Sequence, residues 1–283
     1  MQIEAIVSSY ALSRHHFGTG NGPDHLLNNG VRDDLEAQGH AVTVDEVVLP
    51  GELDTDVEAV FGVANAVAER VRKAVRNGLF PLVFAGNCNS AIGAVAGLGA
   101  ENLGVIWLDS HGDFNTPDTT ATGFLDGMGL AVIAGRCWGN MAKQVPGFAP
   151  VPESHIAHIG GNQFDADEEK LLRSTGAQVI TATEYGENRS MPDRALAALS
   201  DAGVRHVYLH LDLDVLNAEE APANHYGSEE ALSVASVETL IRAVRERFAI
   251  TACGITSYNP DCDPENRTVR ATARLTRAIL STL

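Results

Sequence analysis

The sequence has few cysteines and few basic residues, and both shortages exclude whole classes of protein. The four cysteines, Cys88, Cys137, Cys253 and Cys262, stand far apart and form no CxxC pair, which argues against a disulfide framework and a structural zinc site. There are 20 Lys and Arg against 37 Asp and Glu, a formal charge of -17. Such a charge repels nucleic acid and anionic membranes, so we expect neither as a partner, whereas it favours cations and basic small molecules.

From the start of the sequence and its hydropathy we expect neither a signal peptide nor a membrane-spanning segment. Its first seven residues, MQIEAIV, have neither the basic start nor the apolar stretch of a signal peptide. No segment approaches the length of a membrane span, so we expect a cytoplasmic protein. Hydrophobic residues make up 45% of the chain, and no repeat or linker divides it, which predicts a single domain over residues 1–283.

Short β-branched apolar runs alternate with helical stretches along the chain. The runs are too continuous for half-exposed strands and too short for helices, so most of them predict strands buried on both faces. They are Ile3–Val7, Val42–Val48, Leu79–Phe84, Leu103–Leu108, His155–Ile159, Gln178–Ile180, His206–Leu211 and Ile250–Ile255. Helices are predicted at Asp56–Arg76, Ser233–Phe248 and Arg270–Leu283. This alternation predicts a three-layer α/β sandwich around a largely parallel eight-stranded sheet.

Acidic residues and a histidine directly follow two of these strands. Asp109, His111 and Asp113 come after the fourth run at alternate positions, so their side chains can point to one side. Asp212 and Asp214 follow the seventh run, and ligand sites of parallel sheets lie at these carboxyl ends. Either cluster alone is equally well explained by helix caps or solvated turns. Together they would leave buried charges unpaired without a metal, and their donors suit Mn²⁺, Fe²⁺ or Zn²⁺.

Three stretches of the sequence resemble the motifs of one enzyme family. The segment DSHGDFNTP at 109–117 resembles the DAHxDxNTP signature of arginases and agmatinases, and DLD at 212–214 resembles their later DxD motif. The segment AGNCNSAIG at 85–93 is similar to the family's Gly-Gly-Asp-His stretch and the Ala-Ile-Gly that follows it. This alignment places Cys88 where the family has a histidine ligand. Gly22-Pro23 is similar to the family's early Gly-Pro.

The resemblance implies an arginase-like fold and a metal-dependent hydrolase that cleaves C–N bonds of linear amidines. It implies two Mn²⁺ ions, or another divalent metal, that activate water. The implied metal ligands are Cys88, Asp109, His111, Asp113, Asp212 and Asp214, with Asp109 and Asp212 shared by both ions and Asp113 also orienting the water. Without the alignment, a free cysteine is more simply a small buried hydrophobic residue. We interpret His210, just before Asp212, as a structural or supporting histidine and not as a ligand.

Two positions depart from the family pattern. Asp126 stands where the family has its catalytic histidine, so we expect it to transfer protons only if its pKa is raised. Ser257 stands where arginases have a glutamate that holds the guanidinium, and a serine makes no charge-assisted pair with that group. In contrast, Asn115, Thr122 and Asp165 match arginase contacts to the α-amino and α-carboxyl groups. The expected partner is therefore a small-molecule substrate with an amino-acid-like end.

A cysteine ligand combined with a missing catalytic histidine resembles the Nω-hydroxy-L-arginine amidinohydrolase of D-cycloserine biosynthesis, which releases hydroxyurea and ornithine. A hydroxylated guanidine is less basic than arginine, so it depends less on a carboxylate clamp. Two alternatives stay open. One is a hydrolase of another linear amidine, ureido or amide substrate, and the other is a non-catalytic metal-dependent binding protein. The sequence does not indicate an oligomeric state.

Overall fold

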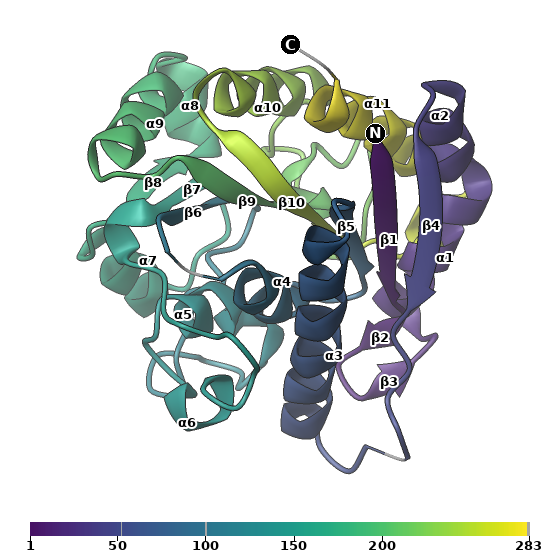
Figure 1. Cartoon of the computed structure of the whole chain (residues 1–283). Helices are drawn as coiled ribbons and strands as arrows, with labels where there is room; N and C mark the ends of the chain where they lie inside the picture. Colours follow the sequence, from purple (N-terminus) through teal and green to yellow (C-terminus); the bar gives the residue numbers. More distant parts are fainter. Residues whose placement is uncertain (52, 100, 282–283) are drawn as a thin grey trace.

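The computed structural model describes residues 1–51, 53–99 and 101–281, and its centre is an eight-stranded parallel sheet (Figure 1). In sheet order the strands are β4 (Ala41–Glu46), β1 (Gln2–Ser8), β5 (Phe80–Ala85), β10 (Ala249–Thr256), β9 (His206–Asp212), β6 (Leu103–Leu108), β7 (Ile156–Gly161) and β8 (Gln178–Thr181). Every neighbouring pair in this sheet is parallel. The predicted strands are therefore confirmed, with ends that agree to within about two residues.

Helices cover both faces of the sheet, as the alternating pattern predicts (Figure 1). The long helix α3 (Asp56–Arg76) and helix α4 (Ser90–Leu98) pack on one face, and α9 (Met191–Asp201), α10 (Val234–Arg247) and α11 (Arg267–Leu280) lie on the other side. Alternate residues of β5 enter two separate hydrophobic cores: Val83 contributes to the α3 side and Phe84 to the α10 side. The three-layer α/β fold is therefore confirmed.

Shorter elements connect these layers. They are β2 (Tyr10–Ala11), β3 (Arg14–His15), α1 (Gly22–Leu26), α2 (Arg32–Ala37), α5 (Gly129–Ile133), α6 (Gly139–Ala142), α7 (Ala166–Arg173) and α8 (Ala182–Glu187). Strands β2 and β3 form a small antiparallel pair outside the main sheet. Several single turns of 3₁₀ helix follow strands, and one of them, η5 (Leu213–Val215), carries part of the site described below.

Two predictions about the elements need correction. Strand β4 is not buried on both faces; most of its residues are exposed, because it forms the edge of the sheet. Helix α11 begins at Arg267, three residues earlier than predicted, because the carboxylate of Asp263 accepts the backbone N–H groups of Arg267 and Thr268. The last two residues of that predicted helix, 282–283, lie outside the described residues.

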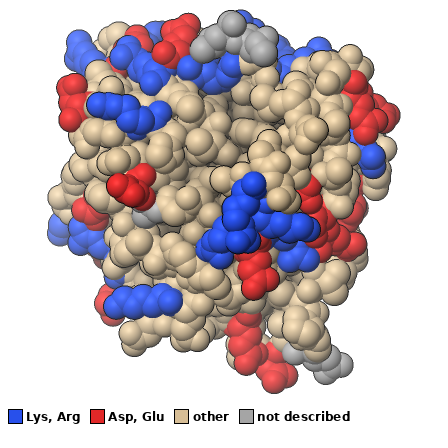
Figure 2. All heavy atoms as spheres, viewed as in Figure 1, with Lys and Arg blue, Asp and Glu red and all other residues tan. Residues whose placement is uncertain are grey.

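The surface mixes both signs of charge despite the large negative total. On the face shown in Figure 2, Lys and Arg side chains lie beside Asp and Glu side chains. Arg70 and Lys73 of α3, for example, lie 2.9 and 3.4 Å from the carboxylate of Asp45. All four cysteines have free thiols. Among the residues that the structure describes, none belongs to a helix long and apolar enough to cross a membrane.

Candidate metal centre

Four neighbouring strands bring the predicted site residues to one edge of the sheet. Cys88 lies in the loop between β5 and α4, and Asp109 directly follows β6. Asp212 is the last residue of β9, and Ser257 directly follows β10. These strands are adjacent in the order β5-β10-β9-β6 and all run parallel. Their carboxyl ends therefore meet at the same edge, where parallel sheets bind their ligands.

One group of possible ligand atoms is completely buried. Cys88, Asp109, His210 and Asp212 each place one ligand atom within 4.8 Å of the others. The thiol of Cys88 donates to Asp212 Oδ2 at 2.7 Å and lies 3.3 Å from the hydroxyl of Ser257. Ser257 Oγ donates to the same oxygen of Asp212 at 2.5 Å. The Ser257 side chain is therefore directed at this group, which also contains a histidine that we did not expect as a ligand.

A second group shares Asp109 with the first. Asp109, His111 and Asp214 place their ligand atoms within 4.8 Å of one another. His111 Nδ1 lies 3.6 Å from Asp109 Oδ1 and 3.4 Å from Asp214 Oδ2. The indole N–H of Trp107 donates to Asp109 Oδ2 at 2.9 Å, and this holds the shared carboxylate between the two groups. The side chain of His111 is 32% exposed, so this second group is the one that solvent reaches.

The chemistry of these donors fits a pair of divalent ions. Buried polar atoms without a hydrogen-bond partner are uncommon, and among the described residues Asp113 Oδ2 and Asp214 Oδ1 are two of them. Carboxylate, imidazole and thiolate together are ligands of divalent transition metals. Asp113 belongs to neither compact group, and Asp212 belongs only to the first. Metal binding by Asp113 and bridging by Asp212 therefore stay predictions.

Burial raises the pKa of most acidic groups of the site, whereas the hydrogen bond and charge of His111 outweigh burial and lower the pKa of Asp214. Burial raises the pKa of Asp109 to about 6, and the charge of Asp214 adds to the rise. Burial, together with neighbouring carboxylates, raises the pKa of Asp113 and of Asp212 well above the ordinary range. The same causes raise the pKa of the Cys88 thiol. A divalent cation would oppose each of these rises, because it stabilises carboxylate and thiolate.

The carboxylates next to His111 raise its pKa, so this residue holds its proton. Burial by itself would lower the pKa of His111, but hydrogen bonds and charge interactions with Asp109 and Asp214 raise it to about 12. The imidazolium therefore neutralises part of the carboxylate charge in the metal-free protein. Since a metal ligand must be the neutral imidazole, a bound ion would replace this proton.

Two residues of the site have left-handed backbone conformations. Asp113 has φ +48° and Ser257 has φ +65°, and such a conformation costs a non-glycine residue roughly 1–3 kcal/mol. The backbone N–H groups of Leu130 and Ala131 donate to the carbonyl of Asp113 at 2.9 and 3.1 Å, which holds it in place. Strain of this kind persists where the surrounding structure fixes it, and functional sites are common places for it.

Asp126 supports the loop that carries Cys88. It begins a 3₁₀ turn, η3 (Asp126–Met128), and its Oδ1 accepts the backbone N–H of Asn89 at 3.1 Å. Its Oδ2 accepts the side-chain amide of Asn87. Burial raises the pKa of Asp126 to about 6, although these hydrogen bonds oppose the rise. Asp126 thus tethers the loop on both sides of Cys88, and proton transfer by this residue stays a prediction.

The three residues expected at the amino-acid end are only partly brought together. The side-chain amide of Asn115 donates to Asp165 Oδ2 at 3.0 Å, which joins the segment after β6 to the start of α7. Thr122 lies in an exposed loop, and its hydroxyl accepts the backbone N–H of Phe124 at 3.2 Å. Within the described chain, Thr122 has no hydrogen bond to Asn115 or Asp165.

Sequence analysis missed Asn224, which connects two parts of the site. Its side-chain amide lies 3.2 Å from Asp214 Oδ2 and 2.8 Å from the backbone carbonyl of Ser257, and it donates to both. It therefore holds Asp214, a predicted ligand in η5, and the backbone after β10 simultaneously. Asn224 lies in a long segment between β9 and α10 that contains no recognisable motif, so no local signal could identify it.

Glu168 is a second supporting residue that the sequence analysis missed. It is buried in the first turn of α7, and its Oε1 accepts the backbone N–H of Phe114 at 2.9 Å. A side chain at Gly112 would collide with it, because an added Cβ would lie 2.5 Å from the Glu168 carboxyl carbon. The glycine between His111 and Asp113 is thus required for the carboxylate to approach the backbone there.

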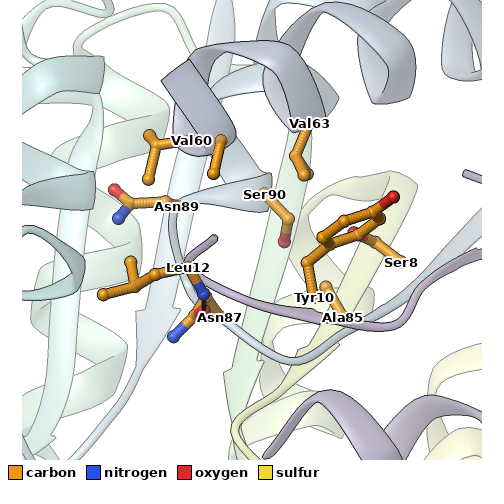
Figure 3. A pocket seen from close by; sticks show the side chains of 10 residues that line it. Ser8, Tyr10, Leu12, Val60, Val63, Ala85, Asn87, Asn89 and Ser90 are labelled. Atoms are coloured by element: carbon orange, nitrogen blue, oxygen red, sulfur yellow. Dashed lines mark hydrogen bonds between the residues drawn. The ribbon is translucent and has the colours of Figure 1, made fainter. Parts of the chain in front are cut away.

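A small cavity lies behind the loop that carries Cys88 (Figure 3). It is lined by Ser8, Tyr10, Leu12, Ala59, Val60, Val63, Ala85, Asn87, Asn89 and Ser90. Its volume of about 20 Å³ accommodates about one water molecule. This volume is too small for an amino acid.

Comparisons with known proteins agree with this geometry. The sequence model of the arginase family matches residues 7–281. An arginase from Bacillus caldovelox is 33% identical over 227 residues, which cover 78% of this chain and 75% of that protein. The crystal structure of arginase from Bacillus cereus superposes with a TM-score of 0.90 at 28% identity, covering 100% of this chain and 99% of that one. Agmatine ureohydrolase of Thermoplasma volcanium has the same fold, with a TM-score of 0.70, 20% identity and coverage of 98% and 87%.

Proposed function

The chain belongs to the arginase family, and from this premise we propose that it hydrolyses Nω-hydroxy-L-arginine to L-ornithine and hydroxyurea. Members of the family are hydrolases that act on C–N bonds of linear amidines at a binuclear metal centre. One observation carries the proposal: two groups of ligand atoms share Asp109, and the buried group contains Cys88 with Ser257 hydrogen-bonded into it. The reacting end of the substrate would therefore bind beside Cys88 and Ser257, two residues that depart from the family's motifs.

The proposed metal ligands are Cys88, Asp109, His111, Asp113, Asp212 and Asp214. Two bound divalent ions, which the family resemblance implies to be Mn²⁺, would supply Lewis-acid charge and a more acidic water molecule. Asp109 would bind both ions, since it belongs to both ligand groups. Trp107 would keep the Asp109 carboxylate in this shared position through its indole N–H.

Asp113 and Asp126 are the proposed acid–base residues. Asp113 has a buried carboxylate oxygen with no hydrogen-bond partner, so it can accept a hydrogen bond from the attacking water and orient it. Asp126, with a pKa of about 6, would exchange protons near neutral pH. Asp126 also accepts hydrogen bonds from the loop of Cys88, and these would fix the position of the thiol.

The environment of Ser257 is the reason to prefer a hydroxylated guanidine over arginine. The guanidinium of arginine keeps its positive charge, and a buried cation without a carboxylate partner is unfavourable. Ser257 offers no charge, and its hydroxyl already donates to Asp212. An N-hydroxyguanidine is less basic, so it enters the site as a neutral group at a smaller cost.

The other end of the substrate would bind near the start of α7. Asp165 is exposed and negatively charged, and it is fixed by Asn115 at 3.0 Å, so it can pair with an α-amino group. The exposed hydroxyl of Thr122 would donate to the α-carboxylate. A single-domain chain, residues 1–283, would carry the whole site, since every strand that contributes to it belongs to one sheet.

The test is a substrate panel with separate detection of hydroxyurea, urea and ornithine. We expect kcat/KM for Nω-hydroxy-L-arginine to exceed that for L-arginine by at least ~10-fold, equivalent to about 1.4 kcal/mol in the transition state. Ureido and amide compounds in the same panel test the alternative substrates. Equal rates, or a preference for arginine, would contradict the proposal, and tight binding without any product would identify a non-catalytic binding protein.

A further inference from the structure

His210 is the one member of the buried ligand group that the family motifs do not supply. It lies on β9, two residues before Asp212, so both side chains point to the same side of the strand. One of its ring nitrogens lies within 4.8 Å of ligand atoms from Cys88, Asp109 and Asp212. Two of these three partners come from other segments of the chain, so the imidazole reaches the group through the fold and not through a contiguous motif.

The ring of His210 is held rigidly from two sides. It stacks on the indole of Trp107, with ring centroids 3.6 Å apart and an angle of 12° between the planes. Its Nδ1 lies 3.3 Å from the hydroxyl of Tyr208, which is also completely buried. Metal-binding histidines commonly use their second ring nitrogen for such a hydrogen bond, because it fixes the orientation of the ring.

The other ring nitrogen, Nε2, has no strong hydrogen bond among the described residues, and the hydroxyl nearest to it also contacts Cys88 and Asp212. Nε2 of His210 lies 3.3 Å from Thr256 Oγ1, longer than the usual N–H···O distance of about 2.9–3.0 Å. The same hydroxyl lies 3.3 Å from Cys88 Sγ and 3.5 Å from Asp212 Oδ2. His210 itself has no exposed surface. A buried imidazole nitrogen at this place is suited to accept an ion that Cys88 and Asp212 also bind.

We propose that His210 is a metal ligand, and that the position formed by Cys88, His210, Asp109 and Asp212 selects Zn²⁺ while the position of His111 takes Mn²⁺. Thiolate, imidazole and carboxylate are all zinc ligands, and zinc in proteins usually has four ligands. Thiolate also favours zinc strongly over manganese. The group of Asp109, His111 and Asp214 has one nitrogen and otherwise oxygen donors, which manganese accepts. This inference rests on the proposed dinuclear centre and deepens it.

The direct test is a crystal structure of the wild-type protein grown with Zn²⁺ and Mn²⁺ together. Anomalous differences measured at the absorption edges of both metals would assign each position. We expect zinc at Cys88, with His210 Nε2 at the usual zinc–nitrogen distance of about 2.0–2.1 Å, and manganese at His111. An imidazole that stays more than about 3 Å from the ion, or manganese in both positions, would overturn the proposal.

A solution test uses Co²⁺ as a spectroscopic probe of the metal-free protein. We expect the first equivalent to produce a thiolate-to-cobalt charge-transfer band together with the intense visible bands of four-coordinate cobalt. In His210→Gln the charge-transfer band should remain and the visible bands should weaken, with at least ~10-fold weaker competition by Zn²⁺. Visible bands of unchanged shape in a folded His210→Gln protein would show that His210 only positions Cys88.

The matched control is His155→Gln. The ring nitrogens of His155 lie 3.2 Å from the backbone carbonyls of Leu103 and Ala202, and this histidine lies outside the site, so the cobalt spectrum should not change. If both positions hold an ion and His210 contacts neither, only the inference about His210 is wrong. No ion in either position would remove the dinuclear centre as well. The expected metals without hydrolysis of Nω-hydroxy-L-arginine would remove only the proposed substrate.

Discussion

The two groups of possible ligands in the candidate metal centre, called here the His111 half and the Cys88 half, differ in how they are built. The half with His111 and Asp214 comes from two short motifs, each contiguous in sequence, and its histidine is partly exposed. The half with Cys88 and His210 is assembled from separate loops and strands and is completely buried. The first half matches the motifs of the arginase family, whereas the second half contains Cys88 and His210, which those motifs do not have. The ligands of the His111 half are thus encoded in contiguous motifs, whereas the ligands of the Cys88 half come together only in the folded chain.

The halves also differ in how they balance charge without metal. His111 has a pKa of about 12 and is a cation beside two carboxylates. No cationic side chain is bonded to Cys88 among the described residues; its partners are Asp212, Thr256 and Ser257. Burial and the neighbouring carboxylates raise the pKa of this thiol instead. The Cys88 half should therefore depend on its ion more than the His111 half does.

Removal of a carboxylate that is predicted to bind both ions should empty both halves equally. We expect this change to have the largest effect on metal content and activity. In Asp109→Ala or Asp212→Ala we expect both ions to be lost and kcat/KM to fall by at least ~10³-fold, about 4 kcal/mol. Metal content by elemental analysis and steady-state kinetics are the measurements. Asp33→Asn, on the exposed surface of α2, is the control that should change neither. Full metal occupancy in either alanine variant would refute the bridging role.

Replacement of Cys88 should affect metal binding in one half and not in the other. Cys88→Ala should lose one ion preferentially and lower kcat/KM by ~100-fold, about 2.7 kcal/mol, while Cys88→His should retain both ions. Alkylating reagents should inactivate the metal-free protein faster than the loaded protein, because a bound thiolate is protected. If Cys88→Ala binds both ions with unchanged affinity and turns over normally, then Cys88 is only a packing residue.

The metal-free protein should become less stable as the pH rises from about 4 to about 6. Asp109 and Asp126 have folded pKa values of about 6 against an ordinary 3.8, so in this window the folded state binds more protons than the unfolded chain. Their contribution is present below pH about 4 and is lost as pH passes 6, by roughly 1–3 kcal/mol per group. Urea unfolding measured across this range checks the slope.

The same titration should distinguish metal-free from metal-loaded protein. A bound ion stabilises the charged carboxylates, so the loaded protein should lose little stability over this pH range. Asp126→Asn should make the slope of the metal-free protein shallower, since one titrating group is removed. A slope identical in wild type and Asp126→Asn would contradict the assignment of a raised pKa to Asp126.

We expect the smallest effect at Asp165, which is proposed to bind the amino-acid-like end of the substrate and lies in neither half. Asp165→Asn should raise KM by ~10-fold, about 1.4 kcal/mol, with kcat changed less than ~2-fold, because this contact is made equally in the ground state and transition state. Asp167→Asn, exposed two residues further along α7, is the matched control. A loss of kcat without a change in KM would show that Asp165 acts on the reacting end.

Much of the fold could be predicted because central parallel strands leave a clear local signal. Strands buried on both faces are continuous apolar runs, such as β6 (Leu103–Leu108), whose bounds the sequence predicts correctly. Edge strand β4 lacks this burial, so its end was misplaced. The start of α11 was missed because its first N–H groups bond to Asp263, a residue outside the helix.

The candidate site was predictable where its residues lie in short sequence motifs. Asp109 and His111, or Asp212 and Asp214, form motifs that alternate along an extended chain. Asn224 has no such motif, although it bonds to Asp214 and to the backbone of Ser257. Its role follows from contacts 10 and 33 residues distant in sequence, which no local pattern encodes.

The sequence by itself determined the strand–helix alternation, the arginase-family motifs and the position of the thiol at Cys88. Only the tertiary structure decided that His210 joins the buried ligand group, that Ser257 donates to Asp212 and that Asp126 tethers the loop of Cys88. The physical reason is the range of the interactions. Hydrophobic periodicity acts between near neighbours, whereas the bond between Cys88 and Asp212 joins residues 124 positions apart. Such a pair meets only after the parallel strands have been ordered side by side.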